Sequence, residues 1–259
     1  MVDDLLGFSE CGNKSISLNT FMNTHIEMKK LQFHTPDARG KSKCHKIHVG
    51  KPREMCPELR VHGTPMESVK SDTYLGDDIS FDGSNTLNVK QRVSKGNGLI
   101  AKIKDMLESL SLGKHYFRIA LLLRESMLIN GIITSAESWY GLRKSEIDQL
   151  EDLDHQFLRH IFEVPRSVPI CALFLETGSI SLETIIKMRR VCFLHYLVNL
   201  SNEEMLYQVF IAQWERPSRI NEWTTEVKAN MVDFNFSHDF DFLKSQSQDA
   251  FLTLVKKNG

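Results

Sequence analysis

Hydrophobic residues recur at helical spacing along most of the chain after residue 85, whereas the pattern before that point is mixed. The segment Leu18–Leu31 repeats apolar residues in the manner of an amphipathic helix. Two short stretches, His45–Gly50 and Thr73–Phe81, are rich in apolar residues and bounded by Gly, Pro and Asp, so we interpret each as a strand. The pattern therefore predicts strands and one helix first, and then a helical region.

Three long segments of the second region have the period of a helix. Asn85 or Thr86 can cap a helix that extends to about Leu110. The segment Lys114–Gly131 is strongly apolar, and Leu182–Leu200 is amphipathic. We expect each of these segments to be a helix.

Two pairs of polar residues have the spacing of a capping box, in which a Ser and an acidic residue three positions later close the start of a helix. Ser145 with Asp148 predicts one helix start, and Ser201 with Glu204 predicts another. The apolar stripe of the first of these helices is interrupted at Asp154. Pattern alone gives no reason for an acidic residue at that position.

The net charge of the whole chain is close to zero, but positive and negative residues are concentrated in different segments. The 259 residues carry a net charge of −1, with 41% hydrophobic residues, which are ordinary globular proportions. Residues 29–53, however, hold eight basic residues and one acidic residue, giving +7. Residues 145–165 hold six acidic residues and one basic residue, giving −5. Local patches of opposite sign can therefore bind partners that the total charge would not suggest.

The cysteines indicate the compartment. Their number is odd, they are scattered, and none forms a C-x-x-C pair, which is typical of reduced thiols in an intracellular protein. The sequence offers no secretory signal and no apolar run of the roughly 20 residues that a bilayer span needs, so we expect no membrane partner. Cys171 and Cys192 stand in apolar helical sequence, and we expect both to be buried structural thiols.

Several charged residues have alternative interpretations. The bases of residues 29–53 are either phosphate contacts or a solvated loop. The lysines of residues 90–104 fit the solvated face of a helix. Arg189 and Arg190 either pair with Glu176 or Glu183 or contact phosphate. Asp72, Asp77 and Asp78 read as solvated charge at a turn.

One pair of adjacent carboxylates could bind metal. Asp3 and Asp4 follow Val2 and precede the apolar run Leu5-Leu6-Gly7-Phe8. Carboxylates at a tight hairpin suit Mg²⁺, and two such ions stabilise the attacking and leaving oxygens in phosphoryl transfer. These residues are followed by a predicted helix, then Lys43 to Lys51, then Tyr74-Leu75-Gly76, then Ile79 to Gly83.

That order resembles the C-terminal part of a non-LTR (LINE-type) retrotransposon reverse transcriptase, an RNA-directed DNA polymerase. The later sequence is similar to the thumb and connecting region of the same transposable elements, so the resemblance covers about residues 1–200. The motifs that carry this second part are Leu122 to Ser126, Asn130-Gly131, Glu137 to Leu142, Leu150-Glu151 with Asp154, Pro165, Pro169, Glu176 with Gly178, and Arg189-Arg190.

The resemblance implies an α+β chain with three parts. Residues 1–83 would be a small, truncated palm-like β/α remnant, and residues 84–216 a mostly α-helical thumb or connecting domain. Residues 217–259 show no clear pattern, and we expect an irregular C-terminal tail. The partner implied is an RNA/DNA primer–template, with the helix that carries Lys90 to Lys104 following its backbone.

The resemblance also implies the site residues. Asp3 and Asp4 would be the catalytic residues and would hold Mg²⁺. The residues that would bind nucleic-acid or nucleotide phosphates are Lys41, Lys43, Lys46 and Lys51. In the family a further metal-binding Asp comes from an earlier strand, which this sequence does not contain. We therefore expect a reverse-transcriptase fragment that is inactive alone; the alternatives are a nucleic-acid-binding module without catalysis and a helical protein-interaction scaffold.

Primer extension tests the catalytic expectation. With the chain alone, Mg²⁺, a primer–template and dNTPs, we expect no incorporation, because two carboxylates supply too few ligands for two metal ions. Incorporation that is lost in Asp3→Ala would overturn this expectation.

Overall fold

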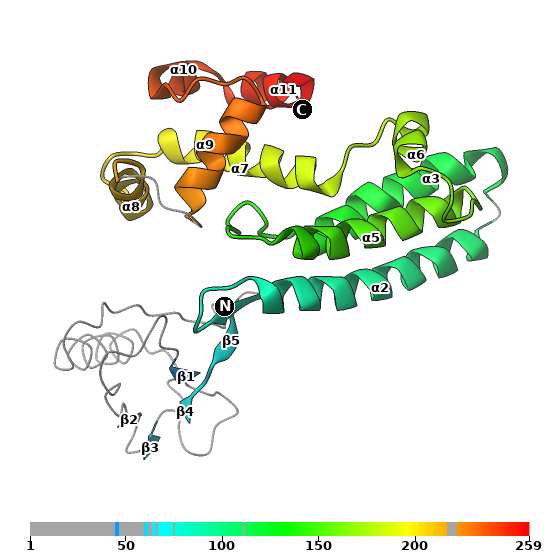
Figure 1. Ribbon diagram of the computed structural model, residues 1–259, viewed down its shortest axis with the longest axis horizontal. Coiled ribbons are helices and arrows are strands. Elements are labelled where there is room, and N and C mark those ends of the chain that lie inside the picture. The colour runs from blue at the N-terminus through cyan, green and yellow to red at the C-terminus, as the bar shows by residue number, and fades with distance from the viewer. Residues whose placement is uncertain are drawn as a thin grey trace. The chain divides into compact units, whose positions relative to one another are not determined.

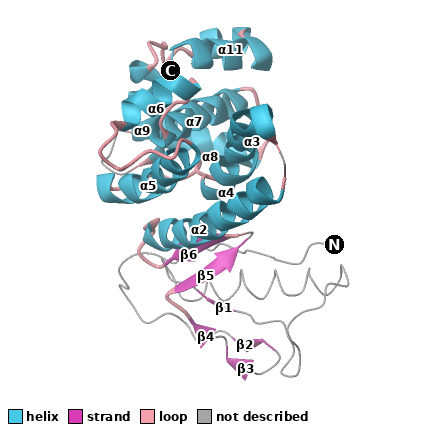
Figure 2. Cartoon of the chain, turned by 90° about the vertical axis from the view of Figure 1, so that its right-hand side faces the viewer, coloured by secondary structure: helices cyan, strands magenta, loops and turns pink. Residues whose placement is uncertain are grey.

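The computed structural model describes residues 45–46, 60–61, 64–65, 67–74, 76–110, 112–216 and 222–258 (Figure 1). The chain divides into two compact units, Met1–Leu87 and Asn88–Gly259. The described strands belong to the first unit, and the described helices form the second, as the colours in Figure 2 show. This is an α+β chain that is mostly helical, as the sequence predicts.

The first unit holds three pairs of short strands. β1 (His45–Lys46) pairs in parallel with β4 (Glu67–Ser68), and β2 (Arg60–Val61) pairs antiparallel with β3 (Thr64–Pro65). β1 agrees with the start of the strand predicted at His45–Gly50; the helix predicted at Leu18–Leu31 lies outside the described residues.

The strand predicted over Thr73–Phe81 is a hairpin instead. β5 (Ser71–Tyr74) and β6 (Asp77–Ser80) are antiparallel, because the chain reverses at Gly76, which has a φ of 85°. Beyond β6, Asp82 accepts hydrogen bonds from Ser80 Oγ at 2.6 Å and from the Ser84 N–H at 3.0 Å. These bonds lower the pKa of Asp82 from 3.8 to about 2.

The helices of the second unit follow the predicted periods closely. The predicted segments 85–110, 114–131 and 182–200 correspond to α2, to α3 with its extension, and to α7. The elements are α2 (Thr86–Ser109), the short 3₁₀ helix η1 (Gly113–His115), α3 (Tyr116–Leu123), the π-helical η2 (Arg124–Ile129), α4 (Asn130–Ile132), α5 (Lys144–Ile161), α6 (Ile170–Thr177), α7 (Leu182–Val198), α8 (Met205–Trp214), α9 (Trp223–Asp233), α10 (Phe240–Ser245) and α11 (Gln248–Asn258).

The two predicted capping boxes have different outcomes. Ser145 is not a cap, because α5 already begins at Lys144 and the carboxylate of Glu146 accepts the Arg143 N–H at 2.9 Å. Of the second box only one bond is present, from the Ser201 N–H to Glu204 Oε1 at 3.1 Å, and Ser201 does not cap α8, because the helix begins at Met205 with Glu204 in the N-cap position and no side-chain cap bond.

The second unit has two hydrophobic cores joined by α7. Leu182 and Ile186 of α7 belong to the first core, which α2, α3, η2, α4, α5 and α6 complete. Val191 and Leu194 of the same helix belong to the second core, with residues of α8 to α11. α7 is therefore a shared element of both cores (Figure 1).

The prediction of an irregular segment over residues 217–259 was wrong for the described residues 222–258. These form α9, α10 and α11, and they bury Val227, Met231 and Phe251 against α7. The helices are short and their phenylalanines lie in turns as well as in helices, so no single period marks the segment in the sequence.

Asp154 is buried because it pairs with Arg124. Arg124 Nε and Nη2 donate to Asp154 Oδ1 and Oδ2, both at 2.6 Å, and Arg124 Nη1 donates to Ser179 Oγ at 3.0 Å. The side chains are only 3% and 1% exposed. Asp154 therefore interrupts the apolar stripe of α5 in order to bind the first residue of η2.

We expect Arg124→Met to destabilise the protein by about 3–5 kcal/mol, because it leaves Asp154 charged and unpaired in the core. In the double variant Arg124→Met with Asp154→Leu, most of that loss should be recovered, since an apolar pair of similar volume needs no partner. Urea unfolding measures both variants. If Arg124→Met lowers the free energy of unfolding by less than about 1 kcal/mol, the ion pair does not fix the positions of η2 and α5.

Two glycines of α2 differ in their surroundings. A Cβ at Gly96 would lie 2.5 Å from Leu153 Cδ1 and 2.9 Å from Ile132 Cγ2, whereas a Cβ at Gly98 would meet nothing within 4 Å. Leu153 is itself buried, so its methyl groups cannot move away freely. Gly96 therefore permits close packing of α2 on the core, but packing does not explain Gly98.

This difference gives opposite expectations for two alanine variants. Gly96→Ala should destabilise the protein by about 1–3 kcal/mol through overpacking. Gly98→Ala should stabilise it by up to about 1 kcal/mol through helix propensity. Thermal or urea unfolding measures both, and equal effects in the two variants would contradict the packing assigned to α2.

Candidate nucleic-acid interface

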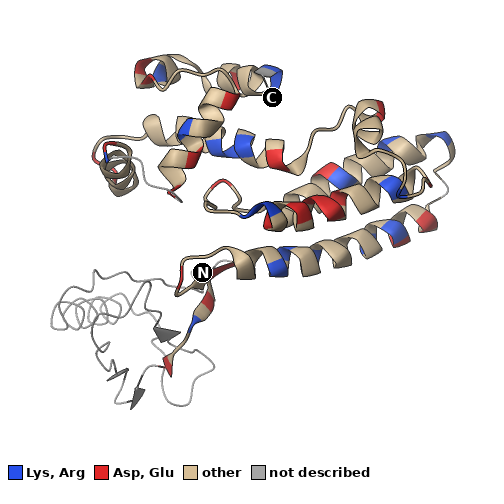
Figure 3. Ribbon diagram, viewed as in Figure 1, with Lys and Arg blue, Asp and Glu red and all other residues tan. Residues whose placement is uncertain are grey.

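The outer side of α2 carries basic and small polar residues. Its buried side comprises Val89, Gly96, Ile100, Ile103 and Leu107, among others, at spacings of three and four. We define the α2 lysine face as the exposed residues Lys90, Gln91, Ser94, Lys95, Asn97, Gly98, Ala101 and Lys102. Figure 3 shows basic residues along this helix in blue.

The charge of this face is not balanced locally. In the described part of the chain, no carboxylate forms an ion pair with Lys90, Lys95 or Lys102, and α2 itself has no acidic residue before Asp105. At 1.5 Å per residue, Lys90 and Lys102 are separated by about 18 Å along the helix axis. Positive charge at intervals along one exposed face is suited to a row of phosphates.

Gly98 lies within this face and leaves its surface open. A glycine inside a helix costs about 1 kcal/mol relative to alanine, and a Cβ at Gly98 would meet no atom within 4 Å. With Ser94 and Ala101 nearby on the helix, it leaves a shallow strip between the lysines. A partner's backbone can approach the helix closely along that strip.

Most of the site residues predicted from the sequence lie outside the described residues. These are Asp3, Asp4, Lys41, Lys43 and Lys51; Lys46 is described only as the second residue of β1. In the described parts of the chain, no group of three or more His, Cys, Asp or Glu side chains is arranged to hold a metal ion.

The acidic residues at the β5–β6 hairpin have local roles. The Asp72 carboxylate accepts the Thr73 N–H at 2.9 Å, and Asp78 Oδ1 accepts the Thr73 hydroxyl at 2.6 Å. Asp77 is half-buried at the start of β6. Of these contacts, the one between Thr73 and Asp78 joins the two strands, so Asp78 contributes to the strand pair.

Arg189 and Arg190 are held by structural contacts, as one of the two interpretations predicts, but with different partners. Arg190 Nη1 lies 2.9 Å from Glu226 Oε2, and burial lowers the pKa of the Arg190 guanidinium below its ordinary value. Arg189 donates to the Ile133 carbonyl at 3.1 Å and to Asn130. Sequence reasoning missed Glu226 because it belongs to α9, in the segment without a clear pattern.

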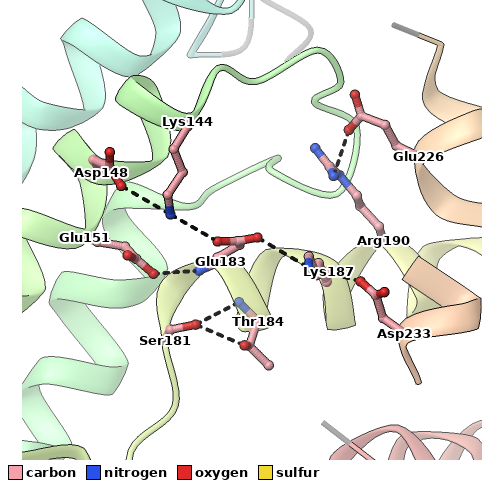
Figure 4. A network of polar contacts seen from close by, with 10 residues as sticks. All are labelled: Lys144, Asp148, Glu151, Ser181, Glu183, Thr184, Lys187, Arg190, Glu226 and Asp233. Atoms are coloured by element: carbon pink, nitrogen blue, oxygen red, sulfur yellow. Dashed lines mark hydrogen bonds and ion pairs between the residues drawn. The ribbon is translucent and has the colours of Figure 1, made fainter. Parts of the chain in front are cut away.

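Glu183, the partner predicted for the arginines, binds lysines instead. It lies 3.5 Å from Lys144 Nζ and 3.3 Å from Lys187 Nζ, and Lys187 Nζ lies 3.0 Å from Asp233 (Figure 4). Burial lowers the pKa of Lys187, but the contacts with Asp233 and Glu183 outweigh burial, so its pKa is raised overall. These charges join α5, α7 and α9 and neutralise one another, which leaves no cation in this network for a ligand phosphate.

Backbone groups of the connection between α4 and α5 form hydrogen bonds to side chains of α9. The indole N–H of Trp223 donates to the Glu137 carbonyl at 2.7 Å, and the Gly141 N–H donates to Glu226. Trp139 is 3% exposed in the first core, as expected for a core aromatic. The connection therefore has a structural role between the two cores.

Comparisons with known proteins identify no relative. No protein-family model matches the sequence, and no curated protein or solved structure matches it. In the described residues, no helix is long and apolar enough to cross a membrane. The case for a function therefore rests on the residues themselves.

The two described cysteines differ, and the prediction that both are buried was wrong for Cys171. Cys171 is exposed, whereas Cys192 is partly buried on α7. Burial raises the pKa of the Cys192 thiol from 9.0 to about 11, although Lys256 acts in the opposite direction. Cys192 therefore remains a neutral thiol at physiological pH.

Alkylation by iodoacetamide at pH 8 should distinguish the two thiols. The raised pKa leaves Cys192 with about 100-fold less thiolate than an ordinary cysteine, so it should react much more slowly than Cys171. Its rate should rise towards pH 11, and its ionisation should reduce stability as the pH rises from about 9 to about 11. Peptide mass spectrometry measures each site, and equal rates at pH 8 would contradict the burial of Cys192.

Proposed function

We propose that this chain is part of a non-LTR retrotransposon reverse transcriptase and that its helical unit binds nucleic acid as a thumb-like domain. The order of the sequence motifs supports the family. The α2 lysine face supports the binding role, because its three lysines have no carboxylate partner among the described residues. This face is the single observation that carries the binding role.

The binding mode follows from the side chains of the face. It has lysines for phosphates and small residues for close approach, but no aromatic side chain on which a base could stack. Binding should therefore be independent of sequence and directed to the backbone of an RNA/DNA primer–template. In the intact polymerase, such contacts would position the primer, with Asp3, Asp4 and Mg²⁺ supplying the phosphoryl-transfer chemistry.

Salt-dependent binding to an RNA/DNA duplex tests this proposal. The triple variant Lys90→Gln, Lys95→Gln and Lys102→Gln should bind more weakly, and its slope of log K against log salt should be shallower by about 2.7, if each lysine contacts one phosphate. The matched control removes three exposed charges elsewhere, by Lys114→Gln, Arg166→Gln and Lys257→Gln. Equal slopes for the two variants would contradict the assignment of this face.

Gly98→Leu provides a second arm of the same experiment. It should stabilise α2 but obstruct the strip between the lysines, so binding should weaken while unfolding shifts to higher denaturant. A purely structural role for Gly98 would give no loss of binding.

The protein-interaction scaffold is the second candidate, and one observation favours it. Met205, Leu206 and Val209 on α8 are 79%, 45% and 50% exposed, which leaves an apolar helix face without a partner in the described residues. In the salt titration, a flat response of the unaltered chain would favour this candidate over nucleic-acid binding.

A further inference from the structure

An apolar groove of about 540 Å³ lies beside α7 and α11, and its lining includes residues that pack against both cores. One wall is a continuous helical stripe of α7 that includes Ile185, Met188 and Cys192, and the other wall carries Leu252 of α11. This volume is within the usual range of small-molecule sites, about 300–1,000 Å³. The α2 lysine face contributes no residue to the groove. A ligand in the groove is therefore independent of the proposed nucleic-acid binding.

Two cations line the groove, and neither of them forms an ion pair with a described carboxylate. Arg189 is bound to a carbonyl and to an amide oxygen, both of which are neutral. Lys256 has no carboxylate within ion-pair distance in the described part of the chain. Glu137 also lines the groove, so the local charge is +1.

The raised pKa of Cys192 is consistent with a weakly solvated interior, because burial disfavours the thiolate even though Lys256 is near. Lys256 is exposed and Arg189 is half-buried, so a carboxylate can reach both cations without being fully removed from water. Apolar walls with uncompensated positive charge therefore complement a molecule that has an apolar body and one acidic group.

We propose that this groove is a binding site for an apolar monocarboxylate, with its chain along the α7 stripe and Leu252 and its carboxylate at Lys256 and Arg189. The ligand class is defined by two features, the aliphatic chain and the single negative charge, and each can be varied separately.

Titration of the full chain with hexanoate, octanoate, decanoate and decanol tests both features. Affinity should rise by about fourfold per methylene along the acids, as expected for burial of the chain. Decanoate should bind at least about fivefold more tightly than decanol, because only the acid can pair with the cations. Equal affinity for decanol and decanoate would overturn the charge assignment, and no dependence on chain length would overturn the apolar one.

Two variants and one chemical probe locate the site. Lys256→Gln should weaken decanoate binding about fivefold, whereas Lys257→Gln, at a neighbour that is likewise exposed but does not line the groove, should leave it unchanged. Saturating decanoate should slow alkylation of Cys192 at pH 9 and leave that of the exposed Cys171 unaltered. Binding without protection of Cys192, or equal losses in both lysine variants, would place the ligand elsewhere and overturn the proposal.

Discussion

The ion pair between Arg124 and Asp154 is the constraint on which the first core of the helical unit depends. Both charges are removed from water, so each needs a partner of fixed geometry, and the guanidinium binds both carboxylate oxygens at once. The pair joins the start of η2 to the middle of α5, and Ser179 adds the connection before α7. Because a bidentate pair tolerates little displacement, the relative positions of these elements are defined by it.

α7 connects the first core to the second core. Its first half packs in one core and its second half in the other, while Arg189 and Arg190 bind the α3–α4 region and α9. The side chains of Lys144, Glu183, Lys187 and Asp233 are between 30% and 69% exposed, so each pair contributes at most about 1 kcal/mol and serves mainly to align the helices. α9 to α11 are thus part of a packed unit, not an appendage.

This arrangement separates structural charges from those that can bind a partner. The arginines of α7 seemed open to a phosphate when only the sequence was considered, but their hydrogen bonds hold the fold together. The lysines of α2 lie on a solvated face, as the sequence predicts, and they form no ion pair among the described residues on a helix with an exposed glycine. Binding of nucleic-acid phosphates is therefore better sought on the outer face of α2 than at the motif with two adjacent arginines.

The sequence by itself determined the α+β class and the positions of α2, α3 and α7, because each of these helices buries one long stripe whose period is visible in the chain. Only the tertiary structure decided why Asp154 interrupts such a stripe, which acid binds Arg190, and how residues 222–258 fold. Arg124 and Asp154, like Arg190 and Glu226, are distant in the chain, and no local pattern specifies which charges meet. Short helices such as α10 bury too few residues to show a period, so their order comes from the core they contact.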